Sequence, residues 1–394
     1  MKKSFCIVFM LLCSLTGATA QFVVDTLLNK YSSQPIDFSV QVPDGNYRVT
    51  VTLGSPKRAA QTVVRAESRR HFTDVITTKK GKYETVTFLV NKHQPRIDGQ
   101  TVVKLKPREY TYKNWDDSLN FQFCGLAPAV RRIRIESAPD AVTLFLCGNS
   151  TVVDQELEPW ASWGQMITRW FDDRVAVANY AESGLSATTF LAQLRLDKIL
   201  TQLHAGDYVV CEFGHNDEKE KKAGDGAWYS YSRNLKIFAD RVREKGGHII
   251  FITPTARRFF NDDQKTLRNT HGDYPDAMRT VASRELVPLI ELNGMTHTFY
   301  EALGFEGSKR ALVHYPANTF PDQPQALADN THFNPFGAWE VAKMVVMGLK
   351  QLQSPLVEYL RSDWQDFDPA QPDDPDLFVW YPSGNANITK PDGN

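Results

Sequence analysis

Apolar and polar residues alternate with a period of two through the first third of the chain. The alternation is clearest in Ile36–Val42 and Tyr47–Leu53, and Asp44-Gly45 stands between these runs as a turn. A similar run follows at Val86–Val90. Short alternating runs separated by turn residues predict an antiparallel β-sandwich, which we place at residues 21–139.

The pattern changes near Asp140, where short apolar runs begin to alternate with amphipathic stretches. A parallel sheet covered by helices on both faces has this pattern, so we expect a three-layer α/β/α domain over residues 140–362. The expected strands are Val142–Cys147, Val175–Val177, Tyr208–Phe213, His248–Ile252 and Val287–Leu292. The expected helices are Trp160–Phe171, Thr189–Leu203, Tyr229–Lys245, Asp276–Glu285 and Gly337–Leu352.

The two ends of the chain differ in sequence pattern from the two expected domains. Lys2 and Lys3 precede the apolar run Phe5–Leu15, and Ala18-Thr19-Ala20 has the small-x-small form of a cleavage site. The apolar run is shorter than the roughly 20 residues that a membrane span needs. We therefore expect a signal peptide over residues 1–20, cleaved after Ala20, and secretion to the periplasm or the extracellular space. The last part, residues 363–394, is expected to pack back on the body as a tail.

Composition narrows the class of protein. A length of 394 residues suggests two domains, and a formal net charge of -1 gives no reason to expect a nucleic-acid partner. Cys124, Cys147 and Cys211 follow the leader at wide spacings, which indicates buried free thiols, although a bridge between the last two stays open. No cysteine or histidine motif supports a metal site.

Residues able to carry out chemistry follow the expected strands. Ser150 comes two residues after Gly148 at the end of the first strand, Gly184 follows the second strand, and Asn216 follows the third. Asp329 and His332 stand just before the last helix. Because active sites of open parallel sheets lie at the carboxyl ends of the strands, these residues are candidates for one site.

The order serine, glycine, asparagine and histidine resembles the signature of the SGNH hydrolase superfamily. This resemblance implies that Ser150 is the nucleophile of an esterase and that His332 takes its proton. It also implies that Asp329 orients the histidine and stabilises its charged form.

The same resemblance implies an oxyanion hole. Its donors would be the backbone N–H groups of Ser150 and Gly184 and the side-chain amide of Asn216. Asn149 stands where the family usually has an aspartate, which leaves open how this loop is oriented. Asp217, next to the asparagine, is interpreted as a structural turn residue.

A closer resemblance is to rhamnogalacturonan acetylesterases, the twelfth carbohydrate esterase family. It covers Trp163–Met166, Glu212–Asp217 and His332–Gly337, whereas Gly184-Leu185-Ser186 departs from a common Gly-Arg-Ser form. It implies removal of O-acetyl groups from a pectic polysaccharide without a metal or organic cofactor. The expected partner is an acetylated plant cell-wall polysaccharide or oligosaccharide, with no membrane insertion.

Several residues are candidate substrate contacts. Trp160 and Trp163 follow the nucleophile and either stack on sugar rings or belong to the core. Arg257, Arg258 and His271 follow the fourth expected strand. A galacturonate carboxylate suits a bidentate arginine, and surface salt bridges are the alternative.

Other functions stay open. The chain is also compatible with an SGNH esterase acting on acetylxylan, a lipid or a thioester, and with a catalytically dead carbohydrate-binding protein. The polar and aromatic segments Asp154–Trp163 and Asp262–Tyr274 favour a sugar leaving group over a long acyl chain. The front sandwich resembles galactose-binding-like modules, and it either binds carbohydrate or buttresses the esterase domain.

Overall fold

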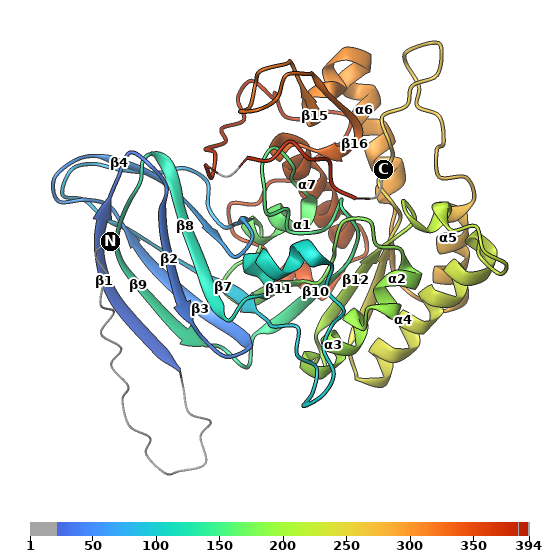
Figure 1. Cartoon of the computed structure of the whole chain (residues 1–394), viewed down its shortest axis with the longest axis horizontal. Helices are drawn as coiled ribbons and strands as arrows, with labels where there is room; N and C mark the ends of the chain where they lie inside the picture. The colour runs from blue at the N-terminus through green and yellow to red at the C-terminus, as the bar shows by residue number, and fades with distance from the viewer. Residues whose placement is uncertain (1–21, 385, 393–394) are drawn as a thin grey trace.

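The N-terminal part contains two antiparallel sheets that face each other (Figure 1). The computed structural model describes residues 22–384 and 386–392, so the expected leader lies outside the described residues. The strands are β1 (Val23–Tyr31), β2 (Ile36–Gln41), β3 (Gly45–Leu53), β4 (Ala60–Ala66), β5 (Arg70–His71), β6 (Ile76–Thr78), β7 (Glu84–Lys92), β8 (Ser118–Ala127) and β9 (Ala129–Ser137). One sheet has the order β1-β9-β3-β7 and the other the order β2-β8-β4-β5, with β6 paired to β4.

The alternation read from the sequence is the burial pattern of this sandwich. Val49 and Val51 of β3 are fully buried, and Phe121 and Phe123 of β8 belong to the same core. Period-two burial is what two packed sheets require, so the predicted β-sandwich is confirmed. Two short 3-10 helices, Pro107–Thr111 and Lys113–Trp115, lie between β7 and β8.

The next part is a parallel sheet of five strands with the order β11-β10-β12-β13-β14. Leu144 and Leu146 of the central strand belong to one core, and Phe145 and Cys147 belong to the other, so both faces are covered. This confirms the three-layer α/β/α domain. The strands are β10 (Val142–Gly148), β11 (Val175–Asn179), β12 (Tyr208–Glu212), β13 (His248–Ile252) and β14 (Leu289–Ile290).

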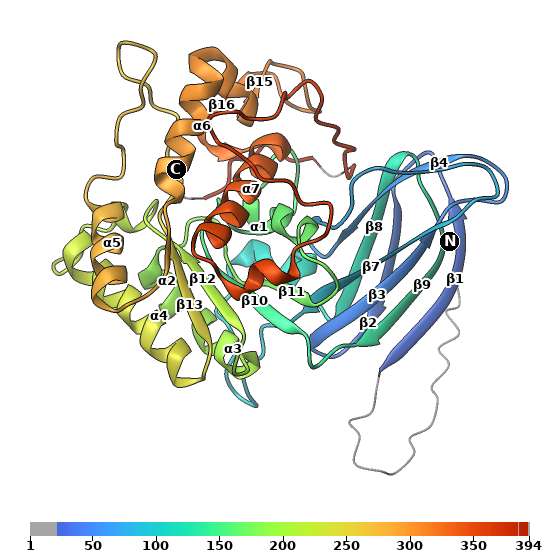
Figure 2. The same cartoon turned by 180° about the vertical axis from the view of Figure 1, so that it is seen from behind.

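Seven α-helices lie among the described residues, and none is long and apolar enough to cross a lipid bilayer. One face of the sheet carries α1 (Trp163–Met166), α6 (Leu292–Gly307) and α7 (Pro335–Gln351). The other carries α2 (Ala187–Ala192), α3 (Arg195–Gln202), α4 (Ser232–Glu244) and α5 (Tyr274–Arg284). Figures 1 and 2 show these layers from opposite sides.

Some elements differ from the expectation. The single helix expected over Thr189–Leu203 is two helices, because Leu194 adopts a left-handed backbone with φ of 63°. Helix α6 was not expected; its glycines weaken helix propensity, and Gly304 interrupts it with φ of 76°. The antiparallel pair β15 (Leu312–Tyr315) and β16 (Leu327–Phe333) was not expected either.

The described cysteines are buried free thiols, as the sequence predicts. Cys147 and Cys211 are register partners on the neighbouring strands β10 and β12. Burial raises the pKa of the Cys147 thiol well above its ordinary value, which keeps this group protonated and unreactive.

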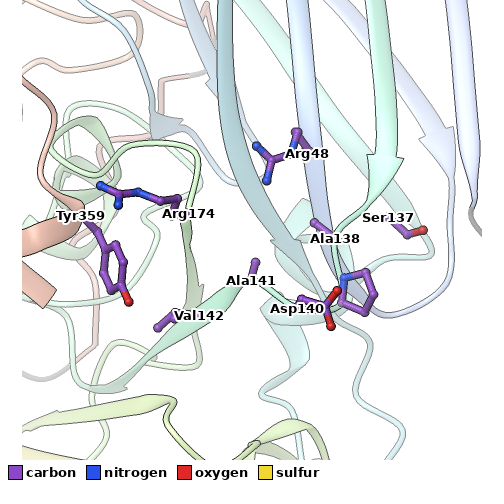
Figure 3. Close-up of a pocket in the computed structure, with 9 residues that line it drawn as sticks. Arg48, Ser137, Ala138, Asp140, Ala141, Val142, Arg174 and Tyr359 are labelled. Atoms are coloured by element: carbon purple, nitrogen blue, oxygen red, sulfur yellow. The ribbon is translucent and has the colours of Figure 1, made fainter. Parts of the chain in front are cut away.

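A cavity of about 580 Å³ opens where the sandwich meets the parallel sheet (Figure 3). Its lining includes Val142, the first residue of β10, so it lies at the amino-terminal edge of the sheet. Arg48 in its wall is ion-paired with Asp173, and the Arg174 guanidinium lies 4.9 Å from the centre of the Tyr359 ring. The carboxyl ends of the strands, where catalysis is expected, lie at the opposite edge.

One buried arginine ties the sandwich to the α/β part. Arg70 of β5 is fully buried, and its Nε lies 2.5 Å from Oδ2 of Asp154. Its Nη1 donates to the carbonyl oxygens of Asn91 on β7 (2.8 Å) and Val177 on β11 (3.1 Å). The guanidinium therefore bonds both parts at once, in a place where an unpaired charge is costly.

Replacing this arginine should uncouple the two parts. Arg70→Ala leaves the Asp154 carboxylate buried without its main cation, and we expect a loss of about 3–5 kcal/mol in the free energy of unfolding. Urea denaturation measures it. Arg132→Ala, which breaks the solvent-exposed pair with Asp25 on the outer strands, is the control and should change stability little. Equal effects of the two variants would contradict the coupling.

Candidate active site

The loop after β10 holds Ser150 in a fixed position. Asn149 Oδ1 accepts hydrogen bonds from both the backbone N–H and the hydroxyl of Thr151, each at 3.0 Å. The carbonyl oxygen of Ser150 accepts from the side-chain amide of Gln155 at 3.0 Å. An asparagine oxygen thus closes this turn, where the resemblance had left the role of the missing aspartate open.

Ser150, His332 and Asp329 form one hydrogen-bonded line. The distance from Ser150 Oγ to His332 Nε2 is 2.9 Å, and that from His332 Nδ1 to Asp329 Oδ2 is 2.8 Å. Burial raises the pKa of Asp329, but its hydrogen bonds with His332 and the charge there outweigh burial and hold the pKa well below its ordinary value. An ionised carboxylate therefore faces the imidazole, as proton transfer from the serine requires.

Asp329 and His332 both lie on strand β16, just before helix α7. The other oxygen of Asp329 accepts from the backbone N–H groups of Thr331 (2.8 Å) and His332 (2.9 Å). Arg258 supports the strand, because its backbone N–H donates to the carbonyl oxygen of Asn330 at 2.8 Å. The carboxylate is thus aimed by the strand's own backbone.

The glycine and asparagine blocks lie beside the loop that carries Ser150. Gly184 has φ of 79°, a left-handed conformation that favours glycine. Gln155 connects the blocks, since its amide nitrogen also lies 3.4 Å from Ser183 Oγ. The amide of Asn216 donates to the carbonyl oxygen of Leu185 at 2.9 Å. The four motifs predicted from the sequence thus meet at one edge of the sheet.

A buried carboxylate that contacts the Ser150 loop was not assigned a role from the sequence. Glu212, the last residue of β12, is fully buried and accepts from the Thr151 hydroxyl (2.8 Å), the Trp163 indole N–H (2.6 Å) and the Thr255 backbone N–H (3.3 Å). Burial raises its pKa to about 7, although these hydrogen bonds lower it. The only sequence signal was an acidic residue at the end of an apolar strand.

Asp217 joins two of the motifs. Its carboxylate accepts from the backbone N–H groups of Ala187 (2.8 Å) and Gly214 (2.9 Å). Burial raises its pKa to about 7, against the effect of the backbone hydrogen bond from Ala187. The residue fixes the two loops to each other and does not point at the serine's hydrogen-bonded line.

The two tryptophans expected near the substrate have different surroundings. Trp163 is fully buried and its N–H donates to Glu212, which favours the core role among the two alternatives. Trp160 packs edge-to-face on the His332 ring with centroids 5.7 Å apart, and its N–H donates to the carbonyl oxygen of Asn387 at 2.9 Å. Only Trp160 touches the candidate site.

The polar residues after β13 are also internal. Arg257 pairs with Glu218 and donates to the carbonyl oxygen of His215 at 3.2 Å. His271 lies between Glu218 (3.0 Å) and the carbonyl oxygen of Thr255 (2.9 Å). The guanidinium nitrogens of Arg258, likewise buried, bond other groups of the protein. These contacts favour positioning of the loops over the expected contact with a galacturonate.

Comparisons with known proteins show which proteins this chain resembles. The GDSL-like lipase/acylhydrolase family matches residues 146–339. Rhamnogalacturonan acetylesterase RhgT of Bacillus subtilis is 41% identical over 223 residues, which cover 56% of this chain and 95% of that protein. Probable rhamnogalacturonan acetylesterase YesY of the same organism is 31% identical over 218 residues, covering 55% of this chain and 95% of that protein. A crystal structure of YxiM from Bacillus subtilis covers 81% of each chain at 24% identity and a TM-score of 0.48.

Fold, site and relatives together define a serine hydrolase that cleaves esters. The chain belongs to the GDSL-like lipase/acylhydrolase family, the SGNH hydrolases. Within residues 22–384 and 386–392, no group of three or more histidine, cysteine, aspartate or glutamate side chains could hold a metal ion.

The buried Glu212 should make the free energy of unfolding depend on pH. Its pKa is about 7 in the folded chain against 4.5 as the ordinary value, so the folded state keeps a proton that the unfolded state loses. The stabilisation of the folded state by this retained proton is fully present below pH 4.5. It is lost as the pH rises through 7, which lowers the free energy of unfolding by about 3 kcal/mol in total. Glu212→Gln removes it.

Urea denaturation of the native protein and of Glu212→Gln between pH 4 and 8 measures the effect. The native protein should lose stability relative to the variant as the pH rises. Other buried carboxyl groups, such as Asp217, are present in both proteins and cancel in the difference. A difference that does not change with pH would contradict the assignment.

Proposed function

We propose that this protein is a carbohydrate O-acetylesterase that removes acetyl groups from a pectic polysaccharide of the rhamnogalacturonan type. The observation that supports this substrate assignment is the 41% identity with a rhamnogalacturonan acetylesterase along 95% of that protein's length. A second relative with the same printed activity, marked as probable, supports it at 31% identity.

The catalytic roles follow from the hydrogen-bonded line. Ser150 Oγ attacks the acetyl carbonyl carbon while His332 Nε2, 2.9 Å away, takes the hydroxyl proton. Asp329 holds the Nδ1 proton and stabilises the imidazolium that forms. The imidazolium then gives its proton to the departing sugar oxygen, and an acetyl group stays on the serine.

The tetrahedral oxyanion is assigned to three donors. These are the backbone N–H groups of Ser150 and Gly184 and the side-chain amide of Asn216. The amide carries two N–H groups; one donates to Leu185, and we assign the other to the oxyanion. Each such donor is typically worth about 10²–10³ in rate.

Deacylation repeats the chemistry with water. His332 takes a proton from a water molecule, whose oxygen attacks the acetyl-serine carbonyl. Collapse of the second tetrahedral intermediate releases acetate and returns the proton to Ser150. Side chains and backbone groups of the protein carry every step.

A single substitution tests both nucleophile and substrate. Ser150→Ala should lower acetate release from acetylated rhamnogalacturonan by about 10³-fold or more, because no other group can form the acyl-enzyme. Ser283→Ala, on the exposed face of α5, is the matched control and should behave like the native protein. Faster release from acetylated xylan would keep the serine mechanism and refute the pectic substrate.

We also propose that the protein is exported, since its polymeric substrate lies outside the cell. The support is the positively charged start and the apolar run before Ala18-Thr19-Ala20. The mature protein should begin at Gln21, which N-terminal sequencing of the secreted material measures. Ala20→Leu should retain the leader, and a native protein that keeps Met1 would contradict export.

A further inference from the structure

The end of the chain crosses the candidate active site. We call residues 386–392 the C-terminal strap. The backbone N–H of Asn387 donates to the carbonyl oxygen of Glu158 at 2.7 Å, and Trp160 donates to the Asn387 carbonyl. Further along, Lys390 Nζ lies 3.4 Å from Oδ2 of Asp329. The strap therefore touches residues on both sides of the serine's histidine.

The last described residue of the strap, Asp392, lies against the oxyanion-hole loop. A Cβ atom built on Gly184 would lie 2.7 Å from the Cβ of Asp392 and 3.0 Å from Nζ of Lys106. The missing side chain of the glycine is thus what lets a carboxylate and a cation approach the Gly184 loop so closely.

Two cations hold the carboxylate of Asp392. Its Oδ2 lies 3.1 Å from Lys106 Nζ and 2.7 Å from Arg108 Nη1. Burial raises the pKa of Asp392, yet the hydrogen bonds from Arg108 and Lys106 hold it below its ordinary value. The pair of cations thus favours an anion at this place.

The fold positions these two cations independently of the strap. Arg108 Nη2 donates to the carbonyl oxygen of Ser183 at 3.1 Å and pairs with the buried Glu182, while Lys106 also donates to Ser183. The backbone N–H of Lys106 donates to Glu109 at 2.7 Å. These bonds fasten the link between β7 and β8 to the edge of the parallel sheet, so the site is preorganised.

We propose that Lys106 and Arg108 form a binding site for the carboxylate of an acidic sugar in the polysaccharide, and that Asp392 fills this site until the substrate displaces it. The inference rests on the proposed deacetylase function. A uronate offers the same two oxygens and the same charge as Asp392, and an arginine beside a lysine is suited to bind them. An acetylated sugar next to that uronate would then lie at Ser150.

This arrangement separates acidic from neutral substrates. An acidic chain replaces the ion pairs of Asp392 with its own, so displacement of the strap is compensated. A chain whose carboxyl groups are methyl esters must displace Asp392 without that compensation. The protein should therefore deacetylate the acidic polymer more efficiently than its neutral form.

The first test compares acetylated rhamnogalacturonan with the same polymer after methyl esterification of its carboxyl groups. Lys106→Gln should lower the ratio of kcat/KM between the acidic and the esterified polymer by about tenfold to a hundredfold, because a hydrogen bond to a charged group is lost. Lys104→Gln, exposed on the same link, is the matched control and should leave the ratio as it is. Equal losses on both polymers, or no loss on either, would overturn the proposal.

The second test measures binding and does not need turnover. The Ser150→Ala protein should bind digalacturonate, and adding Lys106→Gln to it should weaken this binding. Adding Asp392→Asn instead should tighten the binding about two- to fivefold, because a competing exposed ion pair is lost. Calorimetry measures the affinity of all three proteins for digalacturonate.

The outcomes keep the two proposals apart. Binding with this pattern, together with no acetate release from the acidic polymer, would support the carboxylate site and refute the proposed substrate. Digalacturonate affinities that are the same in all three proteins would refute the carboxylate site, whatever the enzyme hydrolyses. An unchanged affinity in Asp392→Asn alone would refute the competition by the strap.

Discussion

The geometry of the site depends on the buried carboxylate of Glu212 at the end of β12. It accepts hydrogen bonds from the Ser150 loop through Thr151, from α1 through Trp163, and from the loop after β13 through Thr255. A carboxylate oxygen can accept several donors at once, so one residue aligns three segments that are far apart in the sequence. Its burial is costly, and these bonds are what offset the cost.

The sandwich is joined to the α/β part by several polar contacts. Arg70 reaches from β5 into the α/β part, and the link carrying Lys106 and Arg108 reaches the loop of Gly184. The C-terminal tail binds both parts as well, since Tyr381 contacts Gln61 (3.3 Å) while Trp380 donates to Glu158 (2.9 Å). These contacts join the front part, the α/β part and the tail.

Several charged and aromatic residues close to the motifs are buried and have partners inside the protein. Trp163, Arg257 and Arg258 are all less than a tenth exposed, and their polar atoms bond other groups of the protein. Their residue types suit sugar binding, which is why sequence reasoning selected them. Residue type does not report burial, and a buried arginine with internal partners has nothing left to offer a ligand.

The two architectures and the four motifs can be read from the amino-acid sequence alone. Period-two alternation and continuous apolar runs reflect which faces are buried, and strand ends place Ser150 and Asn216 at one edge because parallel strands share a direction. The alignment of the loops by Glu212, in contrast, is visible only in the folded chain. The same holds for the meeting of Lys106 and Asp392, 286 positions apart, beside Gly184. Such contacts leave no periodic signal in the sequence, because they depend on how separate elements pack rather than on the pattern within any one of them.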